Sequence, residues 1–334
     1  MLGNSNIAVV GGGSWATALS KILLNNVEEI NWWVRREETA EYIKNFGHNP
    51  NYISSIEFDT EKLNVSNDLK SVIQSSDVIF LVIPSAFLHR EFEKSGITKE
   101  DLKDKVIVSA IKGIIPEFTL IPAAYLNEKF DVEYNNMAIV AGPCHAEEVA
   151  HERLSYLTIA TPTRGRAYAI GDLLKCRYIK VNKNDDLVGT EYSAIMKNIY
   201  AIAAGICHGL GYGDNFMAVL ISNAIRETEQ FIDYVYPKHR DVKTSAYLGD
   251  LLVTAYSQYS RNRTFGNMIG KGYSVKVAQL EMKMVAEGYY ASKCVNEIQT
   301  KFELDLPIAD AVYQCLYNGK DPRRTFESIQ SLLK

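Results

Sequence analysis

The chain has 334 residues, of which 47% are hydrophobic and 23% charged, and its formal net charge is −4. A single hydrophobic core rarely grows past about 250–300 residues, so two domains are expected. The weak negative charge argues against nucleic acid or an anionic membrane as a general partner. Five cysteines with no CxxC spacing favour a reducing, cytoplasmic compartment over a disulfide framework. Only six residues precede the first apolar run, which predicts no signal peptide.

The first half of the chain predicts a parallel sheet. Short apolar runs that alternate with helical patterns are typical of parallel strands covered on both faces. We therefore expect an α/β domain over residues 1–183, with a Rossmann-type, doubly wound, mostly parallel sheet. The predicted strands are residues 7–10, 30–34, 77–83, 105–110, 137–141, 155–161 and 177–182.

The second half, residues 184–334, predicts an all-helical domain. The polar, turn-like residues 182–186 (NKNDD) mark the expected boundary. The apolar stretch 194–210 contains Lys197, Asn198 and His208, so it predicts a buried helix and not a membrane span. The predicted helices are residues 187–209, 214–236, 245–258, 274–301, 307–317 and a last one near 322–333.

A glycine-rich turn follows the first strand and opens a helix, with the pattern Gly11-x-Gly13-x-x-Ala16. In a dinucleotide site, the first glycine permits the tight turn, the second lets the backbone approach a pyrophosphate, and the third small residue lets helix and strand pack closely. The phosphates then lie at the helix N-terminus. The alternative is a structural strand–turn–helix without a ligand, but the context favours a dinucleotide.

The second strand ends in Arg35 and Arg36, where an NAD site usually has an acidic residue for the ribose hydroxyl. Two guanidinium groups suit a 2′-phosphate, which favours NADPH. Glu37 and Glu38 lie just beyond and could serve a ribose, so NADH stays open. A solvated charge cluster at a helix start is the other alternative.

Lys197 lies in a helical stretch, 191–209, that is apolar nearly all round. Burying an unpaired ammonium group is costly, so such a lysine is normally paired, snorkelling to the surface or functional. A buried lysine with a lowered pKa is a usable general acid or base. The residues alone leave the snorkelling and the catalytic interpretations open.

Three loops have the composition of ligand sites. Lys112 ends a predicted strand within SAIKGI (109–114), and AGPCHAEEVA (141–150) follows another strand. In YSRNRTFG (259–266), Ser260 and Asn262 are placed to cap a helix beside an arginine, which suits an anionic group. Taken singly, each is more often a loop or a cap. The histidines show no metal-ligand spacing, so we predict no metal site.

Together these stretches resemble the bacterial NAD(P)-dependent glycerol-3-phosphate dehydrogenase family. The resemblance covers nearly the whole chain and includes GGGSWATAL (11–19), IKGI (111–114), GPCHAEEVA (142–150), KNIYAIAAGI (197–206) and SRNRTFG (260–266). It implies a cytoplasmic enzyme, commonly a homodimer, that reduces dihydroxyacetone phosphate to sn-glycerol 3-phosphate, the backbone precursor of phospholipids. NADPH or NADH would be the cofactor.

The resemblance also implies roles for individual residues. Lys197 would be the catalytic residue, which donates a proton during reduction and accepts one during alcohol oxidation. The implied substrate contacts are Lys112, Gly142, Cys144, Lys197, Asp250, Ser260, Arg261 and Asn262. Together with the glycine turn and the paired arginines, the expected cofactor contacts are Gly11, Gly13, Ser14, Trp15, Arg35, Arg36, Lys112, Ala146, Arg261, Val285 and Glu287.

The sequence departs from the family pattern at three places. Ala16 stands at the third glycine position, where it should still pack closely. Cys144 stands where the family has Ser or Thr, and Ser222-Asn223-Ala224 stands where it has Thr-Arg-Gly. One alternative function is another Rossmann β-hydroxyacid or ketopantoate-type reductase, which should lack the SRNRTFG loop. Another is a non-catalytic redox sensor that binds a dinucleotide, which would need no lysine at position 197.

Overall fold

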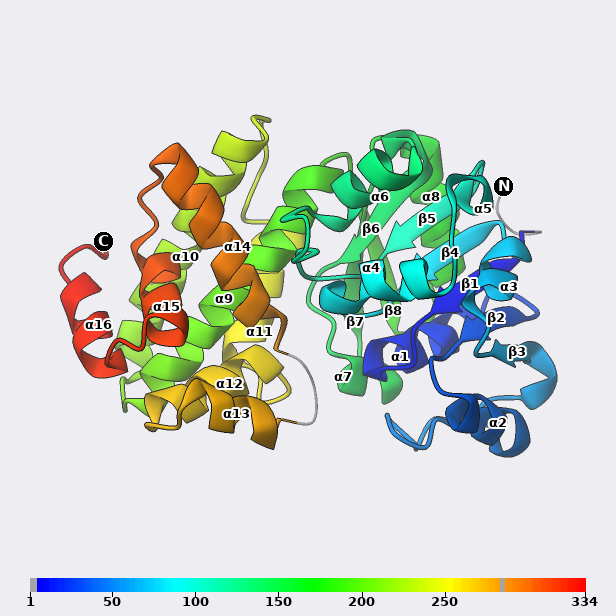
Figure 1. Cartoon of the computed structure of the whole chain (residues 1–334), viewed down its shortest axis with the longest axis horizontal. Helices are drawn as coiled ribbons and strands as arrows, with labels where there is room; N and C mark the ends of the chain where they lie inside the picture. The colour runs from blue at the N-terminus through cyan, green and yellow to red at the C-terminus, as the bar shows by residue number, and fades with distance from the viewer. Residues whose placement is uncertain (1–4, 283–285) are drawn as a thin grey trace. The chain divides into compact units, whose positions relative to one another are not determined.

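A computed structural model describes residues 5–282 and 286–334, which form two compact units. The first unit comprises the chain up to Ile111 and Leu120–Leu187, and the second comprises Lys112–Thr119 and Val188–Lys334. Figure 1 shows the sheet in the first unit and only helices in the second. The predicted fold class is confirmed: a Rossmann-type, mostly parallel sheet is followed by a helical region.

The first unit is built on one eight-stranded sheet with the strand order β3-β2-β1-β4-β5-β6-β7-β8. Neighbouring strands are parallel except for the antiparallel pair β6–β7. The order of the first six strands is that of dinucleotide-binding folds. The strands are β1 (Ile7–Val10), β2 (Ile30–Trp33), β3 (Leu63–Ser66), β4 (Val78–Leu81), β5 (Val106–Ser109), β6 (Met137–Ala141), β7 (Ser155–Ala160) and β8 (Ile179–Asn184).

The strand β3 was not predicted from the sequence. It lies at an edge of the sheet, and its exposed Asn64 alternates with buried Leu63 and Val65. A half-exposed edge strand lacks the continuous apolar run by which the other strands were recognised. The strand β8 also runs further than predicted, to Asn184, because it stays in register with β7.

Helices cover both faces of this sheet. On β1, Ile7 and Val9 join a buried cluster with residues of α1, α2, α7 and α8, while Ala8 and Val10 on the opposite face are also fully buried. The helices of this unit are α1 (Ser14–Leu23), α2 (Glu37–Phe46), α3 (Leu69–Gln74), α4 (Ser85–Lys94), α5 (Lys99–Leu102), α6 (Pro122–Phe130), α7 (Ala146–Ala150) and α8 (Arg164–Leu174).

The second unit contains the remaining helices. None of the helices in the described part of the chain combines the length and apolar character that crossing a membrane requires. The helices are α9 (Leu187–Gly209), α10 (Asp214–Val235), a π-helical turn (Ser245–Gly249), α11 (Asp250–Tyr256), α12 (Arg261–Gly270), α13 (Val275–Glu281), α14 (Glu287–Phe302), α15 (Pro307–Tyr317) and α16 (Pro322–Ile329).

Two of the predicted helices differ from those in the structure. The helix predicted over 245–258 begins with the π-helical turn. Within the range predicted as one helix, 274–301, the described residues form the two helices α13 and α14, and residues 283–285 lie outside the described part of the chain. Met282 ends α13 with an extended backbone (ψ 120°). Apolar periodicity continues past Met282, so the pattern did not reveal the end of α13.

Glycines allow α9 and α12 to cross at backbone contact. A Cβ atom added to Gly266 would lie 2.1 Å from the carbonyl oxygen of Ile202, and one added to Gly205 would lie 2.1 Å from that of Arg263. Real Cβ atoms cannot approach so closely, and only glycine fits at both positions. The crossing fixes the first turn of α12 against α9, the helix that carries Lys197.

Candidate active site

Lys197 lies in the middle of α9 and is buried, with 5% of its surface exposed. Its Nζ forms an ion pair and hydrogen bond with Oδ1 of Asp250, the first residue of α11. Asp250 is 1% exposed. The ammonium group is therefore held inside the helical unit, which excludes the interpretation that Lys197 snorkels to the surface.

Lys112 belongs to the same cluster. Its Nζ lies 3.4 Å from Oδ2 of Asp250, so the two lysines use different oxygens of one carboxylate. The side chain of Lys112 is 21% exposed, which makes it the more accessible of the two ammonium groups. Burial alone would raise the pKa of Asp250, but the charges and hydrogen bonds of the two lysines lower it below its ordinary value. Asp250 therefore stays ionised at neutral pH and orients both lysines.

Asn198 holds the segment that carries Lys112. Its Nδ2 donates a hydrogen bond of 2.7 Å to the carbonyl oxygen of Lys112. No role for Asn198 was predicted from the sequence. The available signal was that it is a second polar residue in an apolar helical stretch, directly after Lys197.

Ser260 and Asn262 occupy the start of α12 but do different things. Ser260 caps the helix, because its Oγ accepts a hydrogen bond of 3.3 Å from the backbone N–H of Arg263. Asn262 is no cap: it lies within the first turn, and its Oδ1 accepts a bond of 3.0 Å from the N–H of Gly288 in α14.

The start of α14 meets the lysine helix at Gly288. A Cβ atom added there would lie 2.5 Å from the carbonyl oxygen of Asn198. The bond from Gly288 to Asn262 therefore joins the first turns of α12 and α14 beside the Lys197 turn of α9. Glu287, a predicted cofactor contact, directly precedes Gly288, whereas Val285 lies outside the described residues.

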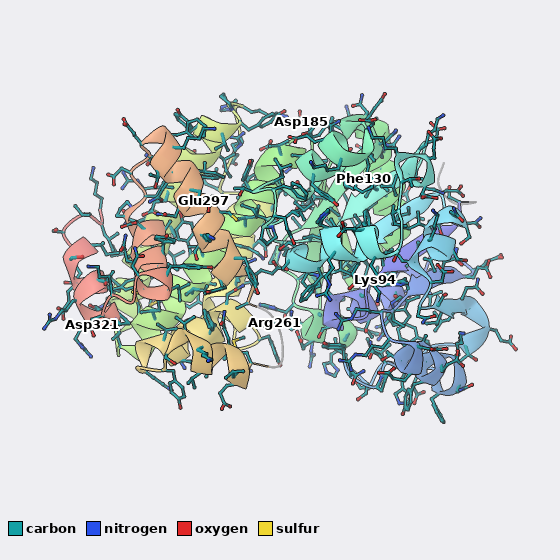
Figure 2. The ribbon with its side chains drawn as sticks, viewed as in Figure 1. Lys94, Phe130, Asp185, Arg261, Glu297 and Asp321 are labelled. Carbon is teal, nitrogen blue, oxygen red and sulfur yellow. The ribbon has the colours of Figure 1, made fainter. Side chains whose placement is uncertain are left out.

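Arg261 is the first residue of α12 (Figure 2). It is partly exposed, and among the described residues its guanidinium group has no ion-pair or hydrogen-bond partner. A partly exposed, unpaired guanidinium beside a helix N-terminus is suited to bind an anion.

The glycine turn of the first unit fits a pyrophosphate. Gly11 has a φ of +146°, and a Cβ atom there would lie 2.4 Å from the carbonyl oxygen of Val82. A Cβ atom on Gly13 would meet nothing within 4 Å, so this side of the turn is open. Ala16 is fully buried, as close packing of helix and strand requires.

The beginning of α1 leaves donors available next to this turn. The helix starts at Ser14 without a side-chain cap and without an acidic residue in its first turn. Within the described part of the chain, the buried Nε1 of Trp15 has no hydrogen-bond partner.

Arg35 and Arg36 are both exposed between β2 and α2. These features suit a phosphorylated dinucleotide.

The three predicted contacts Gly142, Cys144 and Ala146 belong to the first unit. Gly142 follows β6 with a φ of +108°, and a Cβ atom there would lie 2.7 Å from the carbonyl oxygen of Tyr156. The Sγ of Cys144 donates to the carbonyl oxygen of Gly142 at 3.1 Å. Ala146 begins the short helix α7.

Asn223, which replaces the family's arginine, binds the chain's last residue. It donates to the carbonyl oxygen of Lys334 and accepts from its N–H, at 2.9 and 3.0 Å. Ser222 bonds within its own helix, to the carbonyl oxygen of Ala218. At this departure from the pattern, the side chain of Asn223 therefore holds the backbone of Lys334.

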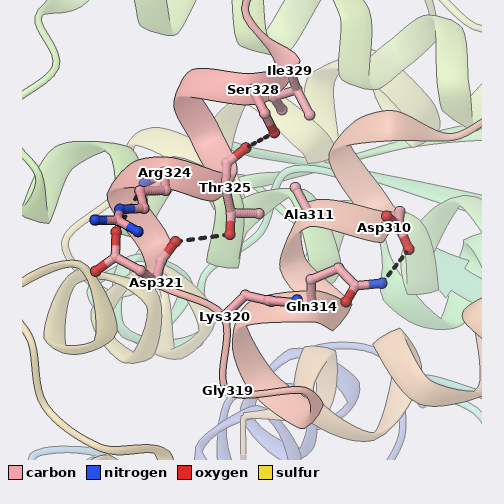
Figure 3. A pocket seen from close by; sticks show the side chains of 10 residues that line it. All are labelled: Asp310, Ala311, Gln314, Gly319, Lys320, Asp321, Arg324, Thr325, Ser328 and Ile329. Carbon is pink, nitrogen blue, oxygen red and sulfur yellow. Dashed lines mark hydrogen bonds between the residues drawn. The ribbon is translucent and has the colours of Figure 1, made fainter.

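A surface groove between α15 and α16 contains none of the candidate residues (Figure 3). Polar groups in it bond to one another: Gln314 donates to Asp310, and Thr325 to the carbonyl oxygen of Asp321. Across residues 5–282 and 286–334, no group of three or more His, Cys, Asp or Glu side chains is placed to hold a metal ion.

Comparisons with known proteins agree with this geometry. The chain matches two family models, "NAD-dependent glycerol-3-phosphate dehydrogenase N-terminus" over residues 6–167 and the corresponding C-terminus over residues 186–327. A protein named glycerol-3-phosphate dehydrogenase (NAD(P)+) from Bacillus velezensis is 32% identical over 329 residues, which cover 98% of this chain and 94% of the relative.

Solved structures resemble this chain to different degrees. The crystal structure of a glycerol-3-phosphate dehydrogenase from Coxiella burnetii has a TM-score of 0.90 at 27% identity, and the match covers 98% of this chain and 99% of that one. A ketopantoate reductase family structure from Ralstonia eutropha has a TM-score of 0.61 at 15% identity, with 96% and 99% covered. The latter likeness extends to the fold alone.

Proposed function

The chain belongs to the NAD-dependent glycerol-3-phosphate dehydrogenase family, and we propose that it reduces dihydroxyacetone phosphate to sn-glycerol 3-phosphate with NADPH or NADH. The reaction is reversible, and its product would supply glycerophospholipid synthesis. The observation that carries the proposal is the buried cluster of Lys197, Asp250 and Lys112, which provides a proton donor of fixed position.

Lys197 is the proposed catalytic residue. The cofactor, when bound, supplies a hydride to the carbonyl carbon of the substrate. Lys197 donates a proton from Nζ to the carbonyl oxygen as the new C–H bond forms, so that the ketone becomes a secondary alcohol. Solvent then returns a proton to the amine. In the oxidation direction, the neutral amine accepts the hydroxyl proton.

Asp250 and Lys112 support this step. Asp250 holds both ammonium groups through one carboxylate and so limits the directions in which Lys197 can point. A second ammonium close by favours the negative charge that develops on the substrate oxygen before the proton arrives. We propose from the family pattern that Gly142 and Cys144 also contact the substrate.

The substrate phosphate is assigned to the start of α12. Arg261 offers an unpaired guanidinium, and Ser260 and Asn262 fix the turn around it. A guanidinium and a helix N-terminus both favour phosphate oxygens. The ketopantoate-type alternative gives no reason for this loop, and its structural likeness is confined to the fold.

The dinucleotide is assigned to the glycine turn at Gly11 and Gly13. Arg35 and Arg36 favour NADPH over NADH, because guanidinium pairs bind a 2′-phosphate. The remaining proposed contacts are Ser14, Trp15, Lys112, Ala146, Arg261, Val285 and Glu287.

We further propose that residues 1–183 bind the dinucleotide and that residues 184–334 act on the substrate. The segment Lys112–Thr119 groups with the helical unit, in keeping with a substrate role for Lys112. A homodimer and a cytoplasmic location are also proposed from family membership. Light scattering coupled to size-exclusion chromatography tests the homodimer, and a mass of one chain would contradict it.

The function is tested with purified protein, dihydroxyacetone phosphate and each reduced nicotinamide. Substrate-dependent loss of absorbance at 340 nm, with sn-glycerol 3-phosphate as the product, is the expected result. Ketopantoate serves as the control substrate. Oxidation of the cofactor with ketopantoate and none with dihydroxyacetone phosphate would replace the proposal with the alternative reductase.

A further inference from the structure

The carbonyl groups of the glycine turn are bound one after another by donors from within the first unit. The indole Nε1 of Trp32 donates to the carbonyl oxygen of Gly11 at 2.7 Å. The Nδ2 of Asn49 donates to that of Gly12 at 3.1 Å. The N–H and Oγ1 of Thr17 donate to that of Gly13, at 3.0 and 3.1 Å.

Asn49 binds both the Gly12 carbonyl and Thr17, the residue that binds the Gly13 carbonyl. It lies between α2 and β3, outside the glycine motif, and is fully buried. Besides the Gly12 carbonyl, its Nδ2 donates to Oγ1 of Thr17 at 2.9 Å. Its Oδ1 accepts from the N–H groups of Asn51 and Tyr52, at 3.0 and 3.2 Å. All the polar atoms of the carboxamide are thus engaged, and its orientation is fixed.

Fixing a carbonyl also fixes the next N–H. In a trans peptide, the C=O of one residue and the N–H of the next point in opposite directions. Holding the Gly12 oxygen on Asn49 therefore directs the Gly13 N–H away from Asn49, toward the open side of the turn. A carbonyl left loose could rotate toward a bound pyrophosphate and repel it.

We propose that Asn49 is a positioning residue for the dinucleotide pyrophosphate, acting through the Gly12 carbonyl and through Thr17. This inference rests on the proposed function, because it requires that the turn binds a dinucleotide. Asn49 itself does not touch the ligand. It keeps the N–H groups of the turn aimed at an anion and the carbonyl oxygens turned from it.

The test is equilibrium binding of NADPH to the full-length protein, followed by nucleotide fluorescence, for the parent and for Asn49→Ala. Each lost neutral hydrogen bond contributes modestly, so the dissociation constant for NADPH should rise roughly three- to tenfold. Adenosine 2′-monophosphate, which has the 2′-phosphate but no pyrophosphate, is the second ligand, measured by displacement. Its dissociation constant should change less than twofold, a selectivity that a merely structural role would not produce.

Matched variants control for folding. Asn51→Ala changes an exposed side chain of the same segment and should leave both constants as in the parent. Thr17→Val removes the hydroxyl that links Asn49 to Gly13 and should weaken NADPH binding, whereas Thr17→Ser should restore it. Should Asn49→Ala not fold, the Thr17 pair decides the question.

The outcomes separate this inference from the proposed function. Equal weakening of both ligands, or no weakening of NADPH, would overturn the positioning role while leaving the enzyme assignment standing. Thr17→Val binding like Thr17→Ser would also overturn it. A parent protein that binds neither NADPH nor NADH would overturn the proposed function and this inference with it.

Discussion

The ammonium group of Lys197 and the carboxylate of Asp250 form a buried ion pair that joins the middle of α9 to the first residue of α11. Burying either charge alone would be costly, so each of the two groups needs the other as its partner. Lys112 binds the second oxygen of the same carboxylate. The Asp250 carboxylate therefore orients two ammonium groups at once. One of them can donate a proton while the other supplies a positive charge next to it.

Replacing Asp250 with Asn should destabilise the protein in a pH-dependent way. The pKa of Asp250 is lower in the folded protein than its ordinary value, so the folded state binds that proton less tightly than the unfolded state. The resulting stability is present above about pH 4 and is lost as the pH falls through the folded pKa. The variant should be less stable than the parent by about 3 kcal/mol or more at pH 6, since the buried Lys197 and the partly buried Lys112 lose their partner.

Urea unfolding of the parent and Asp250→Asn at pH 6 and pH 3 measures this difference. We expect the gap between their unfolding free energies to narrow at pH 3. A gap of the same size at both pH values would mean that the carboxylate charge does not stabilise the cluster.

Glu227 should give the opposite pH dependence. Burial raises its pKa to about 7, although the N–H groups of Ile308 and Ala309 and the hydroxyl of Tyr200 donate to it. The folded state therefore keeps a proton that the unfolded state has lost. The contribution of Glu227 to stability should fall as the pH rises from about 4.5 to 7 and then level off.

The Glu227→Gln variant removes this titration. Thermal or urea unfolding at half-unit steps from pH 5 to pH 8 should show a flatter profile below pH 7 than in the parent. Parallel profiles for the two proteins would show that Glu227 does not titrate in this range.

Arg261→Ala should impair the phosphorylated substrate selectively. Loss of a charge-assisted, paired contact should lower kcat/KM for dihydroxyacetone phosphate. The loss of transition-state stabilisation calculated from the ratio of the two kcat/KM values should be at least about 3 kcal/mol. Phosphate binding also helps to orient the carbonyl, so turnover should fall as well as affinity. Unphosphorylated dihydroxyacetone should be affected much less, and Arg261→Lys should recover only part, because an ammonium lacks the planar fork. An unchanged ratio of kcat/KM for the two substrates would show that Arg261 does not bind the phosphate.

Replacing both Arg35 and Arg36 with Ala should reduce the preference for NADPH. Each charge-assisted contact to the 2′-phosphate contributes roughly 1.5–3 kcal/mol, and NADH has no such phosphate. The Michaelis constant for NADPH should rise far more than that for NADH. Equal changes in the two constants, or a strong NADH preference in the parent, would leave the arginines without a role in cofactor choice.

The sequence predicted the elements with strong local signals. The helix α9 has the predicted bounds. The apolar neighbours of Lys197 left burial and snorkelling both open, and the structure shows that the side chain is buried. The partnership of Lys112 with Asp250 could not be predicted from such patterns, because the two residues are 138 positions apart and meet only through tertiary packing. The contact of Asn49 with the glycine turn was missed for the same reason.

Short or interrupted elements were the other source of error. The strand β3 has one exposed face, and the extended backbone at Met282 ends α13 without a change in the apolar period of the sequence. The helix α12 was anticipated only through its cap at Ser260, since its glycines lower helix propensity. Those glycines are required by the backbone contact with α9, a tertiary demand that outweighs propensity.

The most direct test of the central claim is the rate of NADPH oxidation with dihydroxyacetone phosphate in the parent and in Lys197→Met. Methionine keeps an apolar stem in a buried helix, and Lys112 remains beside Asp250, so the variant should fold, as thermal unfolding and circular dichroism can verify. Removing the proton donor should lower turnover by about a hundredfold or more, while binding of NADPH stays close to that of the parent. A folded Lys197→Met protein with near-parental turnover would contradict the assignment of Lys197 as the catalytic residue.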